Sequence, residues 1–256
     1  VRLNEDTAYG LRIADGGGQQ LAAGEFRTWS STVPIAKTVV LDETNFDGQL
    51  KITDIGTPDG WIKYTAKPGT VLRNDRTRSM LVLDGAEYVI LEGLTLRGGL
   101  QNVVEILGCN NVRVTNCDIA GWGRIGFQRF DLNGMFYLNE TGSGGGAINW
   151  DTGIVVRHRK GTVIERCWIH DPLTRANSWY YAHPAGPQAV GIDKPTSTVL
   201  RYNDFVGSDQ HRWNDAIEGS GNFHPDGGFN RDADIYGSFH CFANDDAIEI
   251  DGGQIN

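Results

Sequence analysis

The sequence lacks long apolar runs and an excess of basic residues, and each absence excludes a class of partner. No run approaches the roughly 18 apolar residues of a membrane-spanning helix, so we expect no membrane partner. Lysine and arginine together number 23 against 32 aspartates and glutamates, which gives a formal charge of −9. Because binding to nucleic-acid phosphates depends mostly on basic side chains, we expect no nucleic-acid partner either.

Metal-binding cysteine and histidine motifs are also missing. The four cysteines, at positions 109, 117, 167 and 241, contain no C-x-x-C pair, and no H-E-x-x-H motif is present. This spacing suits neither a zinc site nor a disulfide-rich scaffold, so we expect the cysteines in the core. The chain has instead 34 glycines, 10% aromatic residues and no long helical period, which is typical of a protein of strands and turns.

A repeat is the strongest signal in the sequence. Five strand-length segments align: VILEGLTL from Val89, VRVTNCDI from Val112, TVIERCWI from Thr162, TVLRYNDF from Thr198 and DIYGSFHC from Asp234. A second short segment follows each of them, starting at positions 102, 152, 188, 215 and 246. Where two successive repeats are farthest apart in the sequence, the residues between them are rich in Gly, Asn, Pro and aromatic residues, as expected of loops that leave and rejoin a regular scaffold.

Strands that recur in register with no helix between them predict an all-β, right-handed parallel β-helix with long loop insertions. We expect one domain over residues 1–256, with a cap and first coils in 1–80 and regular coils in 81–256. The alignment places Cys117 and Cys167 in one inward column with Leu94 and Asn203, as free thiols in preference to a disulfide between coils. A solenoid that ended on AIEID would leave an open edge, so we expect further coils from sequence outside this chain or from a second chain.

The second segments place acidic residues in neighbouring coils. Asp215 aligns with Asp246, which follows Asp245 directly, and Glu218 aligns with Glu249. Adjacent strands lie about 4.8 Å apart, so three aspartates should converge. Crowded carboxylates cannot all ionise freely, and at least one pKa should rise. A protonated acid beside an ionised base is the pair that glycoside hydrolysis requires.

The segments WNDAIEG and ANDDAIEID resemble the paired motifs of polygalacturonase-like β-helix glycoside hydrolases. The resemblance implies that Asp215, Asp245 and Asp246 are catalytic and that the anomeric configuration inverts. It departs from the family pattern because Asn214 directly precedes Asp215 and because the insertion GSGNFHPDGGFNR separates the two motifs. The His-Gly and Arg-x-Lys elements that follow the aspartate pair in the family are missing, which leaves substrate binding unexplained.

Other side chains near these motifs are candidates for contacts with a sugar. Aromatic rings with polar tips stack on sugar faces, although each ring has the alternative of packing a loop onto the scaffold. The basic run RHRK at 157–160 has two interpretations, a site for a sulfate or carboxylate and a solvated turn. We predict that these residues bind substrate: Trp179, Tyr181, His211, Trp213, Glu218, Asp226 and Glu249.

We therefore expect a secreted or periplasmic glycoside hydrolase that acts on a polysaccharide or complex oligosaccharide. The chemistry requires no cofactor. Calcium remains open, because oxygen atoms of Glu218, Glu249, Asp193 and Asp251 on neighbouring coils are suitable ligands. Two alternatives also remain, a β-helix polysaccharide lyase and a non-catalytic carbohydrate-binding or adhesive β-helix.

Overall fold

The computed structural model describes residues 3–124, 127–131, 134–138, 151–173, 175–176, 179 and 184–253. Every regular element in these ranges is a β-strand, and most of the strands belong to three parallel sheets. No helix in the described ranges has the length and apolar character needed to cross a bilayer.

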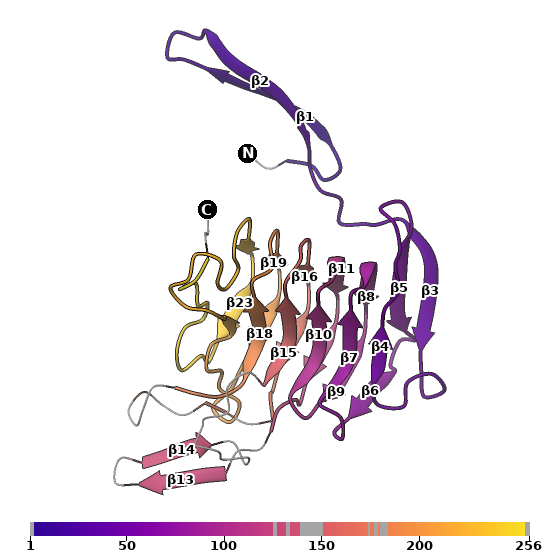
Figure 1. Cartoon of the computed structure of the whole chain (residues 1–256), viewed down its shortest axis with the longest axis vertical. Coiled ribbons are helices and arrows are strands. Elements are labelled where there is room, and N and C mark those ends of the chain that lie inside the picture. Colours follow the sequence, from indigo (N-terminus) through magenta and orange to yellow (C-terminus); the bar gives the residue numbers. More distant parts are fainter. Residues whose placement is uncertain are drawn as a thin grey trace.

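In each of the three sheets the strands lie side by side in chain order, across the width of the view in Figure 1. The first sheet contains β4 (Leu50–Ile52), β7 (Ser79–Asp84), β10 (Asn102–Leu107), β15 (Thr152–Arg157), β18 (Gln188–Asp193) and β21 (Ile217–Gly219). The second contains β3 (Ile35–Leu41), β5 (Trp61–Ala66), β8 (Glu87–Glu92), β11 (Asn110–Thr115), β16 (Val163–Glu165), β19 (Val199–Arg201) and β22 (Asp234–Tyr236). The third contains β6 (Val71–Asn74), β9 (Thr95–Gly98), β12 (Asp118–Ala120), β17 (Trp168–His170), β20 (Asp204–Val206) and β23 (Phe239–Cys241).

The chain visits the three sheets in turn. From β4 onward, three consecutive strands contribute one strand to each sheet, and we call such a set a rung. The sequence repeat is this rung: the bend inside each first segment divides it into a strand of the second sheet and a strand of the third. The first rung begins at Leu50, within the region assigned to the cap and first coils.

Two antiparallel hairpins stand apart from the rungs. β1 (Ala8–Ala14) pairs with β2 (Gln20–Arg27) and projects away from the sheets in Figure 1. Two backbone carbonyls just after β2, at Ser30 and Ser31, accept hydrogen bonds from the guanidinium of Arg113 and so hold this segment to β11. The second hairpin, β13 (Phe127–Asp131) with β14 (Gly134–Leu138), belongs to the insertion between the third and fourth rungs.

The space between the sheets is filled by columns of apolar side chains. In the first sheet Leu81, Val104, Ile154, Val190 and Ile217 are register partners on successive strands, and all are fully buried. Each rung places the same kind of side chain at the same position, so apolar surface is buried by contact with the neighbouring rungs alone. Strands of three to six residues are therefore long enough to form the core.

The predicted column of Leu94, Cys117, Cys167 and Asn203 is confirmed. All four side chains are buried and both thiols are free. Asn203 is satisfied inside the core because its Oδ1 accepts the N–H of Cys167 at 3.0 Å and its Nδ2 donates to the carbonyl of Ile164 at 2.9 Å.

The alignment of the fifth repeat is wrong by one residue. Asp234 pairs with Val199, not with Thr198, so Ser238 and not Phe239 continues the inward column. Phe239 is instead 58% exposed. A one-residue shift exchanges the two faces of a strand, and the left-handed Gly237, which occupies the same turn position as Tyr202, marks the true register.

Candidate active site

The first sheet brings the predicted aspartates together. Ile217 in β21 forms parallel bridges with Val190 on one side and with Ile248 on the other, so Asp215 and Asp246 occupy the same register position on adjacent segments. The backbone N–H of Asp246 donates to Oδ1 of Asp215 at 2.8 Å. The predicted columns are therefore confirmed, including the alignment of Glu218 with Glu249.

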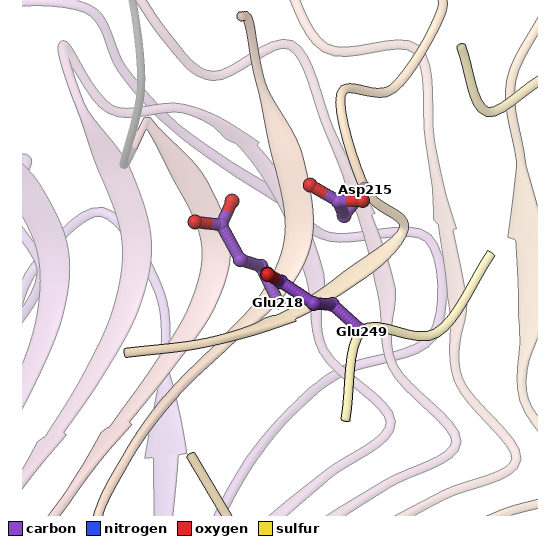
Figure 2. A group of neighbouring side chains, drawn as sticks. All are labelled: Asp215, Glu218 and Glu249. Atoms are coloured by element: carbon purple, nitrogen blue, oxygen red, sulfur yellow. The ribbon is translucent and has the colours of Figure 1, made fainter. Parts of the chain in front are cut away.

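Five carboxylates form what we call the acid cluster: Asp215, Glu218, Asp245, Asp246 and Glu249. One oxygen from each of Asp215, Asp245 and Asp246 lies within 4.8 Å of the others, and the same holds for Asp215, Glu218 and Glu249. Asp215 belongs to both triads and is central. Figure 2 shows the second triad, with Asp215 and Glu218 on one segment and Glu249 on the next.

Burial differs across the acid cluster. Asp215 and Glu218 are buried, Asp245 and Glu249 are half-buried, and Asp246 is exposed. A proton donor that must stay neutral and a carboxylate that must stay charged need different surroundings, and this gradient from buried to exposed provides them.

Two amides orient the buried carboxyls. Nδ2 of Asn214 donates to Oδ2 of Asp215 at 2.8 Å and lies 3.3 Å from Oε2 of Glu218. Nε2 of Gln188, on the preceding rung, also donates to Oε2 of Glu218. These contacts restrict the carboxyl rotamers, so the oxygens that face one another are held in place before any ligand binds.

The pKa values of the buried carboxyls are raised. Burial, with smaller contributions from the charges of Asp245, Glu249 and Asp246, raises the pKa of Asp215 to about 7, although the N–H of Asp246 opposes the shift. Burial and the neighbouring Asp215 and Glu249 raise the pKa of Glu218 to about 8. Burial also raises the pKa of Glu249. Near neutral pH the acid cluster thus holds protons that ordinary carboxyls would have lost.

The role of Gln188 was not predicted. The hydroxyl of Thr152 donates to Oε1 of Gln188 at 3.2 Å, which leaves the Gln188 amide nitrogen facing Glu218. Asn102 precedes them in the same column, and its Oδ1 accepts the N–H of Thr152 at 3.1 Å. The signal was present in the alignment, because the first residue of every second segment is polar and is followed by a small or apolar residue.

Two of the predicted substrate-binding residues, Trp213 and His211, have contacts outside the acid cluster. Trp213 is fully buried and stacks on Trp122 with ring centroids 5.8 Å apart. Its ring is therefore unavailable to a sugar, and Trp213 is not a substrate-binding residue. His211 is half-buried, with Nδ1 2.6 Å from the carbonyl of Pro172. Trp179 is 54% exposed, and Tyr181 lies outside the described residues.

Asp226, which was predicted to bind substrate, is not part of the acid cluster. It lies in an exposed turn, contacts His224 within the turn, and has Oδ1 3.9 Å from Nζ of Lys194. The short separation along the chain between His224 and Asp226 explains the difference, because the turn satisfies this aspartate locally. Of the seven residues predicted to bind substrate, the structure places Glu218 and Glu249 in the acid cluster.

The acidic residues that approach one another also differ from the expected calcium ligands. Asp193 accepts the hydroxyl of Ser220 at 2.6 Å, and Asp251 is exposed. The acidic oxygens that approach one another are those of Asp215, Glu218 and Glu249. A divalent cation with oxygen ligands fits this triad chemically, and Asp215 and Glu218 would have to lose their protons to bind it.

Comparison with protein-family models, with curated proteins and with solved structures gives no match. The case for a function therefore depends on the site itself. A buried carboxyl that retains its proton near pH 7, within 4.8 Å of a half-buried and an exposed carboxylate, is suited to donate a proton to a leaving group while a second carboxylate acts on the reacting carbon or on water.

Proposed function

We propose that the chain is a right-handed parallel β-helix that hydrolyses glycosidic bonds in a polysaccharide or complex oligosaccharide. The observation that supports it most is the acid cluster, in which the pKa of buried Asp215 is raised to about 7 beside Asp245 and Asp246. The rungs support the fold, because from β4 onward, apart from the hairpin β13–β14, successive strands enter the three parallel sheets in rotation. The handedness follows from the strong preference of parallel crossovers for the right-handed path.

In this mechanism Asp215 is the acid. It gives its proton to the glycosidic oxygen as the bond from that oxygen to the anomeric carbon breaks, and the leaving sugar departs as an alcohol. Asp246, exposed and close, is the carboxylate that acts on the opposite side of the anomeric carbon. Asp245 contributes negative charge that stabilises the developing positive charge on the sugar ring.

The separation of the carboxylates bears on stereochemistry. Oxygens of Asp215 and Asp246 lie within 4.8 Å. Inverting enzymes generally keep about 6.5–9.5 Å between the two carboxyl groups to admit water, whereas retaining enzymes keep about 5–5.5 Å. The gap therefore supports direct attack by Asp246, a covalent glycosyl ester and its hydrolysis by water that Asp215 deprotonates. It gives less support to the inversion implied by the resemblance.

The neighbouring glutamates have a separate role. Glu218 is held by Gln188 and Asn214, and its raised pKa keeps it protonated at neutral pH, so it can donate a hydrogen bond to a sugar hydroxyl. Glu249 receives a hydrogen bond from Nδ2 of Asn222 and can accept one from the sugar. Together they would orient the ring over Asp215 without taking part in bond cleavage.

A second candidate is a divalent-cation site, which the triad of Asp215, Glu218 and Glu249 favours. It is compatible with a structural role in a carbohydrate-binding β-helix or with a polysaccharide lyase. The lyase has less support, because a lyase needs a basic residue at the reacting carbon, and no Lys, Arg or His in the described ranges forms an ion pair with Asp215, Glu218 or Asp246.

The test is release of reducing ends from a panel of plant, algal and host glycans. Wild-type protein should release them from at least one glycan, and Asp215→Asn and Asp246→Asn should each lose more than about a hundredfold, the usual contribution of a catalytic acid or nucleophile. Asp193→Asn is the matched control, since it removes a nearby carboxylate outside the acid cluster and should keep activity.

The outcomes separate the candidates. Equal activity in wild type and Asp215→Asn would exclude our assignment of the acid. Products with ultraviolet absorbance from a new double bond would identify a lyase. Glycan binding without products, in protein shown to be folded by circular dichroism, would favour the binding module. Proton NMR of the first product distinguishes retention from inversion.

A further inference from the structure

A second polar site lies where β15 and β18 end. A hollow of about 470 Å³ is lined there by His158, Arg159, Lys160 and Lys194, with Asp226 at its edge. We call these five residues and the space between them the basic hollow. It contains most of the RHRK run that the sequence left with two interpretations.

The basic hollow has an excess of positive charge in a chain whose formal charge is −9. Arg159 and Lys160 are exposed and form no ion pair within the described ranges. Lys194 lies 3.9 Å from Asp226, and that carboxylate is also in contact with His224. Three permanent cations thus face one shared acid, so the hollow attracts anions.

Two residues of the basic hollow occupy a turn position where other rungs have glycine. One register position at the end of the first sheet is left-handed in five rungs, with φ of 65° at Gly85, 60° at Gly108, 58° at His158, 59° at Lys194 and 74° at Gly221. Glycine adopts this conformation without steric cost, whereas a residue with a Cβ adopts it only at a cost in free energy.

A histidine and a lysine therefore stand at two positions where other rungs use glycine. Arg159, with φ of 64°, adds a second left-handed residue directly after the first. Left-handed residues other than glycine also occupy the turn between the second and third sheets, at Asn116, Arg166 and Tyr202, so it is the charge gathered at this turn that distinguishes the basic hollow.

The basic hollow adjoins the acid cluster. Gly191 is the register partner of Glu218, and Lys194 follows Gly191 by three residues, which is about 10 Å along a strand. The turn between β21 and β22 connects the two sites, because Asn222 donates to Glu249 at one end and Asp226 lines the basic hollow at the other. One extended polymer can therefore reach both.

We propose that the basic hollow binds a sulfate or carboxylate group on the same polysaccharide whose glycosidic bond lies at the acid cluster. This rests on the proposed function for the identity of the polymer. The anion would be met by the guanidinium of Arg159 and the ammonium groups of Lys160 and Lys194. It would sit about 10 Å along the strand from the register position of Glu218 and about 20 Å from that of Asp215, where the bond is cleaved, which makes the substrate an acidic glycan with at least several sugar units.

The test measures binding of three polymers by isothermal titration calorimetry: dextran sulfate, polygalacturonate and neutral dextran. The Asp215→Asn background prevents turnover. Arg159→Gln with Lys160→Gln, and separately Lys194→Gln, should weaken binding of one of the acidic polymers about tenfold or more, the effect of losing one charge-assisted hydrogen bond. Lys67→Gln removes an exposed cation far along the chain, between β5 and β6, and should change nothing.

The two acidic arms identify the group. Weakening confined to dextran sulfate assigns a sulfate, and weakening confined to polygalacturonate assigns a carboxylate. Neutral dextran bound as tightly as the acidic polymers, or acidic polymers bound equally by the hollow variants and Lys67→Gln, would overturn the inference.

The inference and the proposed function fail separately. If wild-type protein releases no reducing ends but the hollow variants still lose binding, the proposed hydrolysis is refuted and the proposed anion site is supported. If hydrolysis depends on Asp215 but neither binding nor turnover changes in the hollow variants, the proposed anion site is refuted and the proposed hydrolysis is supported.

Discussion

Replacement of Glu218 by Gln should stabilise the protein, and the gain should grow with pH. The carboxyl is buried and its pKa is raised from 4.5 to about 8, so the folded chain binds more protons than the unfolded chain between these values. Wild-type stability therefore falls as pH rises from about 4.5 to 8 and levels off above. Gln has no proton to lose, and its Oε1 can accept the hydrogen bonds that Gln188 and Asn214 donate.

The magnitude follows from the shift. A shift of one pKa unit corresponds to about 1.4 kcal/mol, so the full effect at pH 8 has an upper limit of about 5 kcal/mol. Coupling to Asp215 shares the cost between two groups, and we expect roughly half. In a chain of this size that raises Tm by about 5–10 °C at pH 8, with no difference at pH 4.

The assay is thermal unfolding followed by circular dichroism at pH 4, 6 and 8. Glu105→Gln is the matched control: it lies in the same column, but it accepts the hydroxyl of Ser79 at 2.8 Å and lies 3.4 Å from Nε of Arg78, so its loss should lower Tm at neutral pH. A Glu218→Gln variant that is less stable than wild type at pH 8, or a difference that does not change with pH, would refute the argument.

Four further outcomes follow from the same structure. Trp213→Ala should lower the free energy of unfolding by about 3–5 kcal/mol in a urea titration, because it empties a fully buried ring position; a loss below about 1 kcal/mol would contradict that burial. Asn203→Ala should cost about 1–3 kcal/mol by the same titration, since the N–H of Cys167 and the carbonyl of Ile164 lose their partner; an unchanged midpoint would contradict it. Thiol alkylation under denaturing conditions, read by mass spectrometry, should label both Cys117 and Cys167 without prior reduction, and protection of both would reveal a disulfide. Added calcium should raise Tm more at pH 8 than at pH 6, because protons compete for the same carboxyls, and an equal rise at both would place the ion elsewhere.

The columns of the fold could be predicted because each rung repeats the same local pattern. Polar and acidic residues such as Asp215 and Asp246 recur at the first position of the second segments, and their register follows from alignment alone. The fifth first segment failed because its apolar pattern, with exposed Phe239, resembles the alternative register. The left-handed Gly237 would have corrected it.

Burial and cross-rung contacts could not be predicted in the same way. Whether Glu218 is buried and meets Gln188, thirty residues away, depends on packing between rungs and insertions, which no local pattern specifies. The same holds for Trp213, whose position beside Asp215 in the sequence suggested a sugar platform, whereas its ring points into the core. Trp213 and Asp215 precede β21 and belong to no regular strand, so strand alternation does not specify which side each of them faces.

The most direct test of the central claim is digestion of an acidic glycan in heavy-oxygen water, with the products analysed by mass spectrometry. Hydrolysis through Asp215 and Asp246 predicts saturated products that each carry one heavy oxygen at the new reducing end, and none from Asp215→Asn. Unsaturated products without heavy oxygen, or labelled products formed equally by Asp215→Asn, would contradict the account.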